Sequence, residues 1–333
     1  MTYKSILAAT AAALTATATQ AQDLVEVSFG TNWLAQAEHG GFYQSVADGT
    51  YADCGLDVTI VPGGPQVNNR ALMLAGKLDF HMGGDMLQAF NAVKEDIPVV
   101  VVAATFQKHP QVILAHPGKA DTFEDLADLT LLIGDNGFTS YYQWMIDEYA
   151  FTVEQREPYT FNPAPFLANE NLGMQGYLSS EPYMVEQQGG FTPDVFLIAD
   201  AGFSSYATTM ETMQQTVDER PEVVECFVDG SIKGWYNYLY ADNTAANTLI
   251  LDDNPDMTED KLDYAVEKMK SEGIVDSGSA LEDGIGALSE QKIGDFYAKM
   301  VSAGVIEDDV DWRASFTTDF VNDGVGMDLK PSN

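Results

Sequence analysis

The stretch VSFGTNWLAQAEHGGFY, residues 27–43, contains a strand pattern, then a polar and aromatic loop, then the start of a helix. Val27 and Phe29 alternate with smaller residues at the two-residue period of a strand. The glycine pair at 40–41 precedes a helical run whose first backbone N–H groups have no partner within the helix. In open α/β sheets, ligands bind just beyond the carboxyl ends of strands. The sequence therefore predicts that the loop from residue 31 to 41 binds a ligand.

Strand and helix patterns alternate from this stretch onward. Further strands are predicted at 56–61, 78–82, 99–106, 112–115, 129–133, 176–178 and 195–198. Helices are predicted at 66–75, 86–93, 140–149 and 181–187, and turns at 62–65, 83–85 and 134–137. Alternation at this spacing indicates βαβ units and a mostly parallel sheet. The run 99–106 is apolar on both faces, as expected of a central strand.

The chain of 333 residues is too long for one small core and suits two compact lobes. The last third has little strand pattern, and helices are predicted there at 221–240, 244–251, 258–271 and 289–303. Because these helices need a sheet to cover, we expect them to return to the first lobe. We therefore predict an α/β fold with two lobes, in which lobe 1 comprises 22–106 and 205–333 and lobe 2 comprises 107–204. Crossings near 105–108 and 199–204 would form a double hinge beside an interlobe cleft.

The charge balance excludes some classes of partner. Asp and Glu number 51 against 16 Lys and Arg, a formal net charge of -35. Such a surface repels phosphate backbones and anionic lipid headgroups, so we expect neither nucleic acid nor a membrane surface as a partner. No stretch after the N-terminal region approaches the ~20 apolar residues of a membrane span.

Residues 1–21 have the pattern of a cleaved secretory signal. Lys4 gives a positive start, an apolar Ala/Thr-rich stretch follows, and Thr19-Gln20-Ala21 is a cleavage site of small residues. We expect a periplasmic protein cleaved after Ala21. In that oxidising compartment Cys54 and Cys226 are able to form a disulfide, and buried free thiols are the alternative that the sequence leaves open.

Catalytic and metal signatures are missing from the sequence. It contains no G-x-S-x-G elbow, no phosphate-binding G-x-x-x-x-G-K-[ST] loop, no H-E-x-x-H and no G-x-G-x-x-G after a strand. His109 and His116 each precede a proline and have a poor spacing for zinc. The acidic runs at 252–256 and 308–311 lack the central glycine and distal glutamate of a calcium loop. We predict neither a metal nor a cofactor.

Polar and aromatic side chains gather at the predicted carboxyl ends of strands and at the crossings. The candidate ligand-binding residues are Asn32, Trp33, His39, Tyr43, Asp85, Gln107, Phe138, Thr139, Ser140, Tyr141, Glu181 and Tyr206. Aromatic rings stack on conjugated rings, and carboxylates accept hydrogen bonds from amines and ring N–H groups. Lys108 is the one evident cation among these segments, whereas an anion site usually includes Arg or Lys. This balance favours a neutral or amine-bearing heterocycle as the ligand.

Each candidate also has a purely structural explanation. Trp33 and His39 sit where they could pack between strand and helix, and Asp85 sits where it could cap the helix that follows. Glu181 lies at a helix start, where the dipole favours a carboxylate whether or not a ligand is bound. Trp144, on the same helix as Tyr141, is expected in the core, and packing is also the preferred role of Tyr183.

Several stretches resemble one family of proteins. These are NWLAQAEHGGFYQSVADGTYADCGLDVTIVPGG (32–64), LMLAGKLDFHMGG (72–84), TFEDLADLTLLIG (122–134), GYLSSEPYMVEQQG (176–189) and ERPEVVECFVDG (219–230). In content and order they are similar to periplasmic solute-binding proteins of ABC importers. The branch concerned includes receptors for nitrate, taurine, sulfonates, the thiamine pyrimidine precursor and riboflavin.

The resemblance implies a type II periplasmic binding protein fold, capture of a small solute by lobe closure, and delivery to ABC permease subunits. It lends binding roles to Asn32, Trp33, His39 and Glu181, which fall in the matching stretches. The loops at 83–85 and 134–138 depart from those of any single ligand class. We predict a monomeric, non-catalytic receptor for an amine-bearing heterocycle similar to the thiamine pyrimidine precursor.

Two alternatives remain. One is a receptor of the same fold for nitrate, taurine or another sulfonate, riboflavin or an aromatic acid. The other is a pyrimidine synthase enzyme like the eukaryotic ones that share the fold. Those synthases carry a cysteine-rich cluster that this chain, with two isolated cysteines, lacks.

Overall fold

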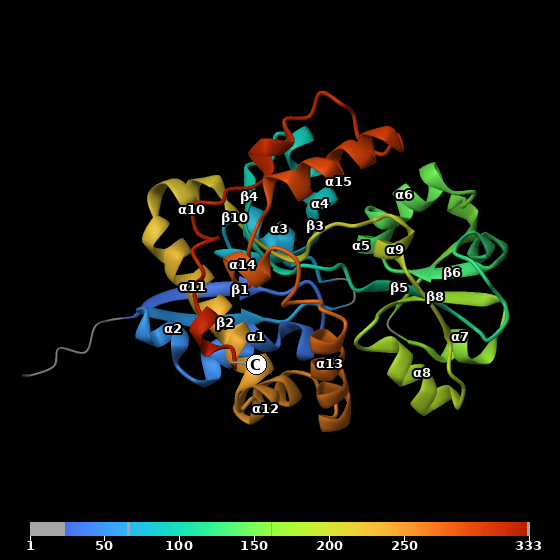
Figure 1. Ribbon diagram of the computed structural model, residues 1–333, viewed down its shortest axis with the longest axis horizontal. Coiled ribbons are helices and arrows are strands. Elements are labelled where there is room, and N and C mark those ends of the chain that lie inside the picture. The colour runs from blue at the N-terminus through green and yellow to red at the C-terminus, as the bar shows by residue number, and fades with distance from the viewer. Residues whose placement is uncertain (1–23, 65–66, 161, 332–333) are drawn as a thin grey trace, which may run out of the picture.

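The computed structural model describes residues 24–64, 67–160 and 162–331, which form two groups of elements, each around its own sheet (Figure 1). The first sheet has the strand order β2 (Leu56–Val61), β1 (Val25–Gly30), β3 (Phe80–Asp85), β10 (Ala207–Met213) and β4 (Val99–Phe106). The second has the order β7 (Arg156–Pro158), β6 (Thr130–Ile133), β8 (Leu172–Tyr177), β5 (Gln111–Ala115) and β9 (Asp194–Leu197). We propose that these two groups of elements correspond to the predicted lobes 1 and 2.

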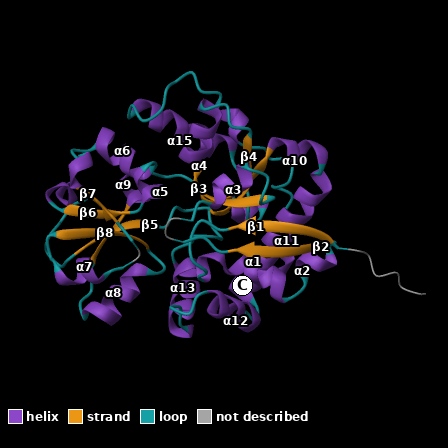
Figure 2. Cartoon of the chain, turned by 180° about the vertical axis from the view of Figure 1, so that it is seen from behind, coloured by secondary structure: helices purple, strands orange, loops and turns teal. Residues whose placement is uncertain are grey.

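Helices surround both sheets, as the view from behind also shows (Figure 2). Those on the chain segments of the first sheet are α1 (Gly40–Ala47), α2 (Thr50–Asp53), α3 (Asn69–Leu74), α4 (Met86–Lys94), α10 (Gln214–Glu219), α11 (Pro221–Tyr240), α12 (Thr244–Asp253), α13 (Glu259–Ser271), α14 (Ala280–Asp283) and α15 (Glu290–Ser302). Those of the second are α5 (Asp135–Phe138), α6 (Tyr141–Glu148), α7 (Ala164–Ala168), α8 (Glu181–Gly189) and α9 (Ile198–Ala201). Short 3-10 helices lie at Ala37–His39, Glu124–Asp128, Val153–Gln155, Trp312–Ser315 and Met327–Leu329.

The long helix α11 returns to the first sheet and packs against α1. Its Phe227 ring stacks on Phe80 of β3, with ring centroids 4.1 Å apart. The two helices approach so closely that a Cβ on Gly234 would lie 1.9 Å from the Ser45 hydroxyl oxygen, so only glycine fits there. This contact explains why α11 returns to the first group of elements, as was predicted for the helices of the last third.

Several predicted elements match the structure and others need correction. The strands at 56–61 and 99–106 and the helix at 221–240 have the predicted bounds. The turn predicted at 83–85 is wrong, because these residues form the end of β3. The turn at 134–137 largely forms the short helix α5. β7 and β10 were not predicted.

The sheets are mixed rather than mostly parallel. β10 runs antiparallel between β3 and β4, and β5 runs antiparallel to both β8 and β9. β4 is therefore an edge strand, not a central one. It is nevertheless buried along its whole length, because bridges from Val101 to Phe316 and from Ala104 to Gly286 cover its free edge. This cover explains why its sequence is apolar on both faces.

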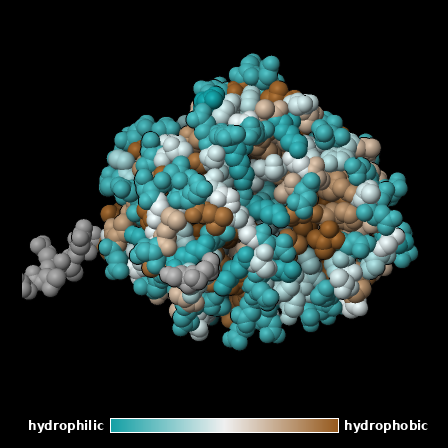
Figure 3. Space-filling view, viewed as in Figure 1, coloured by the Kyte–Doolittle hydropathy of each residue, from teal (hydrophilic) through white to brown (hydrophobic). Residues whose placement is uncertain are grey.

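The face shown in Figure 3 is covered mainly by hydrophilic residues, in keeping with the excess of carboxylates in the sequence. Within the described residues, no helix has the length and apolar character that a bilayer crossing requires.

The two cysteines are joined. Cys54, which follows α2, forms a disulfide with Cys226 of α11 across a sequence separation of 172 residues. The pairing that the sequence left open is thus present, and it ties α11 to the segment between α2 and β2. The bond closes a long loop, so it restricts the unfolded chain strongly.

We expect that replacing both cysteines with alanine lowers the free energy of unfolding by about 2–5 kcal/mol, because the unfolded chain regains the entropy of that loop. Urea unfolding followed by circular dichroism measures the change. A reducing agent should destabilise the natural protein by a similar amount and leave the double variant unaffected. Equal unfolding midpoints for the two proteins would contradict the prediction.

Candidate functional site

A cavity lies between the two groups of elements, at the carboxyl ends of the parallel strands β1 and β3. It encloses about 690 Å³ of empty space, including its open mouth. The first group contributes Asn32, Trp33, Gln36, His39, Gly84, Asp85 and Gln88. The crossing and the second group contribute His109, Gln111, Asn136, Gly137, Tyr141, Gln175, Gly176, Tyr177 and Glu181.

Asp85 ends β3 and begins α4, and both its carboxylate oxygens have partners. Oδ1 accepts the backbone N–H of Gln88 at 3.2 Å, so the predicted helix-capping role is present. Oδ2 accepts the hydroxyl of Ser140 at 2.5 Å. Burial raises the pKa of Asp85 to about 6, although the Ser140 hydroxyl and the cap hydrogen bonds oppose this shift. The residue thus lines the cavity while its carboxylate joins β3 to the segment that begins α6.

Glu181 enters the cavity from the start of α8. Its Oε2 accepts the backbone N–H of Tyr177 at 2.7 Å. The helix approaches β8 so closely that a Cβ on Gly176 would lie 2.5 Å from the Glu181 Cβ. Burial raises the pKa of Glu181 to about 7, against the lowering effect of the Tyr177 N–H. Among the described residues, no hydrogen bond is made to its Oε1, which leaves that oxygen for a ligand.

Two histidines line the cavity as neutral rings, because burial lowers the pKa of each to about 3. His109 accepts the backbone N–H of Gln111 at Nδ1, at 3.2 Å, so its proton must reside on Nε2. Neither that Nε2 nor either ring nitrogen of His39 has a partner within the part of the chain that the structure describes. Buried polar atoms normally form hydrogen bonds, so these nitrogens are available to a ligand or to water.

The aromatic side chains of the cavity come from both groups of elements. Trp33 follows β1, Tyr177 ends β8, and Tyr141 begins α6. The Tyr141 hydroxyl donates to Gln175 Oε1 at 3.0 Å, and Gly137 provides the space for this ring, since a Cβ there would lie 2.4 Å from the hydroxyl oxygen. The cavity therefore offers flat apolar surfaces from two directions.

The structure brings six of the predicted site residues together around the cavity: Asn32, Trp33, His39, Asp85, Tyr141 and Glu181. Three others lie away from it for identifiable reasons. Tyr43 donates its hydroxyl to Asp253 at 2.7 Å in the packing of α1 against α12. Gln107 donates to the carbonyl oxygens of Ala104 and Ala287 at 3.1 and 3.0 Å. The Tyr206 hydroxyl accepts the backbone N–H of Ser289 at 3.0 Å.

The remaining three predicted residues also fall outside the lining of the cavity. Ser140 is buried behind it, bound to Asp85. Phe138 packs beneath the guanidinium of Arg156, 4.9 Å from its ring centroid. Thr139 lines a neighbouring hollow instead. Trp144 is fully buried in the core, and Tyr183 stacks on Tyr264 of α13 at 4.8 Å, both as their packing explanations predict.

Sequence reasoning missed most of the amide residues of the cavity: Gln36, Gln88, Gln111, Asn136 and Gln175. Amides are common on protein surfaces, so their type alone gives no signal. His109 was dismissed as a metal ligand, and its position before a proline gave no hint that it faces the cavity. The glycines at 137 and 176 were a usable signal, because a glycine beside a strand end often marks a close approach.

A second pair of side chains also joins the two groups of elements. The Ser179 hydroxyl, which follows β8, donates a short hydrogen bond to Glu38 Oε1 in the loop after β1. Burial raises the pKa of Glu38. Together with Ser140 and Asp85, this makes two serine-to-carboxylate hydrogen bonds between the segments of the two sheets.

The cavity is poor in positive charge. None of the described residues that line it is lysine or arginine, and Lys108 is not among them. The described residues also contain no group of three or more His, Cys, Asp or Glu placed to hold a metal ion.

Comparison with solved structures identifies the fold. The alkanesulfonate-binding protein SsuA from Xanthomonas axonopodis pv. citri, bound to MOPS, is similar with a TM-score of 0.61 at 11% identity, over 89% of this chain and 99% of that chain. The nitrate-binding protein NrtA from Synechocystis PCC 6803 has a TM-score of 0.57 at 12% identity, over 90% and 88%. The desulfurization enzyme DSZB has 0.56 at 10%, over 89% and 97%. The chain thus has the periplasmic binding protein fold, as predicted.

Sequence comparison then identifies the family. The NMT1/THI5-like family matches residues 36–246, well over half of the chain, so the protein belongs to that family. This agrees with the branch that the sequence motifs resemble. No curated protein matches the chain in sequence.

Glu181 should make the stability of the ligand-free protein depend on pH. Its folded pKa of about 7 lies above the ordinary value of 4.5, so the folded state binds the proton more tightly and the free energy of unfolding falls as pH rises through this window. We expect Glu181→Gln to remove this part of the slope and to exceed the natural protein in stability at pH 8 by up to about 3 kcal/mol. Urea unfolding at pH 5 and pH 8 measures it.

The matched control is Glu186→Gln on the exposed side of the same helix, which should leave the pH slope unchanged. A parallel pH dependence of the natural protein and Glu181→Gln would contradict the raised pKa.

Proposed function

We propose that the protein is a periplasmic receptor that captures a small, amine-bearing nitrogen heterocycle and delivers it to an ABC permease. The observation that carries this proposal is the cavity's pairing of an available carboxylate oxygen on Glu181 with a neutral imidazole N–H on His109, among aromatic rings and without Lys or Arg in its described lining.

The hydrogen-bonding groups match the edge of an aminopyrimidine. An exocyclic amine donates, and the ring nitrogen beside it accepts. Glu181 Oε1 is free to accept from the amine, and His109 Nε2 is free to donate to the ring nitrogen. A cavity that offers both an acceptor and a buried donor disfavours ligands that offer only one kind of group.

Aromatic stacking supports the same class of ligand. Trp33 and the tyrosines at 141 and 177 present rings to the cavity. Stacked aromatic pairs add about 0.5–1.5 kcal/mol beyond the burial of area. A flat heterocycle gains this contribution, whereas nitrate and small alkyl sulfonates gain little of it.

Capture follows from the two groups of elements. The proposed lobes meet at the cavity, so a ligand that contacts both stabilises the closed arrangement relative to an open one. Periplasmic location, association with permease subunits and a monomeric state belong to this proposal. It is supported by the family, by the secretory pattern of residues 1–21, which lie outside the described residues, and by the disulfide, which suits an oxidising compartment.

The alternatives are less well supported by the cavity. Two structural neighbours are named as sulfonate- and nitrate-binding proteins, so a receptor of the same fold for an anion is the first alternative. The carboxylates that line the cavity oppose the binding of an anion. Riboflavin and aromatic acids belong with these anions to the broader alternative, a receptor of the same fold for a different solute. The enzyme DSZB shows that the fold also supports catalysis. Both cysteines of this chain are joined in the disulfide, which leaves no thiol nucleophile for such a reaction.

A thermal-shift screen tests the proposed ligand class. Aminopyrimidines and aminopurines should raise the melting temperature of the mature protein by several degrees, whereas nitrate, taurine and alkanesulfonates should have no effect at the same concentration. Ligand binding to the folded state alone produces such a shift. Stabilisation by an anion without any by heterocycles would overturn the ligand class. The synthase alternative is tested by absorbance spectroscopy of the protein with added pyridoxal phosphate. Failure to bind this cofactor would exclude the alternative.

Replacing Glu181 with Gln should weaken binding of the best heterocycle at pH 8 by roughly 10- to 100-fold, because a hydrogen bond to a charged group contributes about 1.5–3 kcal/mol. Calorimetric titration measures the affinity, with Glu186→Gln as the unaffected control on the same helix. If Lys108→Met weakens binding more than Glu181→Gln does, the ligand is an anion and the role of Glu181 is wrong.

A further inference from the structure

A second, more polar hollow adjoins the cavity. It is lined by Asn32, Val67, Asn68, Asn69, Arg70, His81, Gln88, Asn91, Asn136 and Thr139. Asn32, Gln88 and Asn136 also line the first cavity, so the two spaces share a wall. An arm carried by a ring in the cavity would meet these three shared side chains first.

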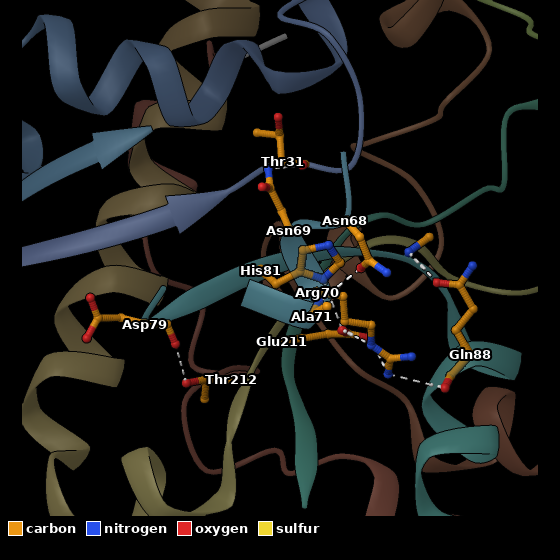
Figure 4. Close-up of polar contacts among 11 residues, drawn as sticks. Thr31, Asn68, Asn69, Arg70, Ala71, Asp79, His81, Gln88, Glu211 and Thr212 are labelled. Atoms are coloured by element: carbon orange, nitrogen blue, oxygen red, sulfur yellow. Dashed lines mark hydrogen bonds and ion pairs between the residues drawn. The ribbon is translucent and has the colours of Figure 1, made fainter. Parts of the chain in front are cut away.

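Figure 4 shows the ion pair of Arg70 with Glu211; Arg70 is one of the residues that line this hollow. Arg70 Nε donates to Glu211 Oε2 at 3.1 Å, and its NH2 group donates to the Gln88 carbonyl at 3.3 Å. His81 Nδ1 lies 3.2 Å from the same Glu211 oxygen. Burial opposes ionisation of Glu211, but Arg70 and His81 outweigh it and lower its pKa. Glu211 is therefore a carboxylate, and it neutralises the guanidinium charge.

The amide groups of the hollow suit a partner that both donates and accepts. Asn69 is 2% exposed, and its Nδ2 donates to the carbonyls of Thr31 and Val61, while its Oδ1 has no partner within the described residues. That oxygen needs a donor, which an anion cannot supply. Within the same part of the chain, the side-chain amides of Asn32, Asn91 and Asn136 make no hydrogen bond, and each offers both a donor and an acceptor.

Hydroxyl groups have this dual character, and an uncharged group suits a guanidinium already neutralised by Glu211. We propose that the hollow binds a hydroxylated, uncharged arm of the ligand, so that the full ligand is an amine-bearing nitrogen heterocycle with a pentose attached, that is, a nucleoside. This inference rests on the proposed function, because it assumes that the ring lies in the cavity beside Glu181.

Calorimetric titration of the mature protein with cytosine, cytidine, 2′,3′-dideoxycytidine and cytidine 5′-monophosphate tests the inference. Cytidine should bind at least tenfold more tightly than cytosine, and loss of the sugar hydroxyls in the dideoxy compound should remove most of that gain. The phosphate should weaken binding, because it adds an anion near Glu211 and Asp85. Equal or weaker binding of cytidine, or tighter binding of the monophosphate, would overturn the inference.

The variant Asn91→Leu isolates the hollow, since Asn91 lines it and not the cavity. We expect about tenfold weaker binding of cytidine and a change of less than twofold for cytosine. An equal loss for both compounds would contradict a separate subsite. Binding of cytosine without a gain for cytidine would overturn this inference alone, whereas binding of neither compound would count against the proposed function as well.

Discussion

The burial of carboxylates between the two sheets is the constraint on which the site depends. Glu38 and Asp85 are buried, Glu181 is half-buried, and burial raises the pKa of each. A buried charge is costly unless hydrogen bonds satisfy it. Serine hydroxyls from the segments of the second sheet satisfy two of the three, Ser179 at Glu38 and Ser140 at Asp85. Glu181 retains an oxygen without such a partner. The pattern distinguishes two carboxylates that hold the junction together from one that is available to a ligand.

This division of roles gives a physical account of capture. If the lobes separate, Glu38 and Asp85 exchange serine hydroxyls for water, which is a nearly balanced exchange because both solvate a carboxylate. The serine contacts therefore set the geometry of the closed arrangement without dominating its stability. A ligand that satisfies Glu181, His39 and His109 stabilises only the arrangement in which these groups converge. The energy difference between open and closed forms is then supplied mainly by the ligand, as a receptor that must also release its solute requires.

Elements that a local sequence pattern determines were predicted correctly, whereas elements and site residues that depend on tertiary contacts were missed. The strand at 56–61 and the helix at 221–240 were predicted with their observed bounds because their periodicity is strong. β10 was missed because ATTMETM lacks strand alternation, and it is a strand only because β3 and β4 lie on either side of it. At the site, Trp33 and Glu181 were found from their positions at a strand end and a helix start. The amides were not, because a glutamine such as Gln175 becomes distinctive only once folding places it against Gly134 and Tyr141.

The placement of charged side chains also explains how one fold is able to bind anions in some proteins and amine-bearing ligands in others. Binding sites in this architecture lie at strand ends and loops, which change without disturbing the sheets. Here those positions hold Asp85 and Glu181 in the cavity, and Arg70 in the adjoining hollow is already neutralised by the buried Glu211. An anion entering the cavity would meet raised-pKa carboxylates and no free cation in its described lining. The ligand proposed above, an amine-bearing ring with an uncharged arm, would meet acceptors, neutral imidazoles and amides instead, so the proposed selectivity rests on the placement of a few charged side chains.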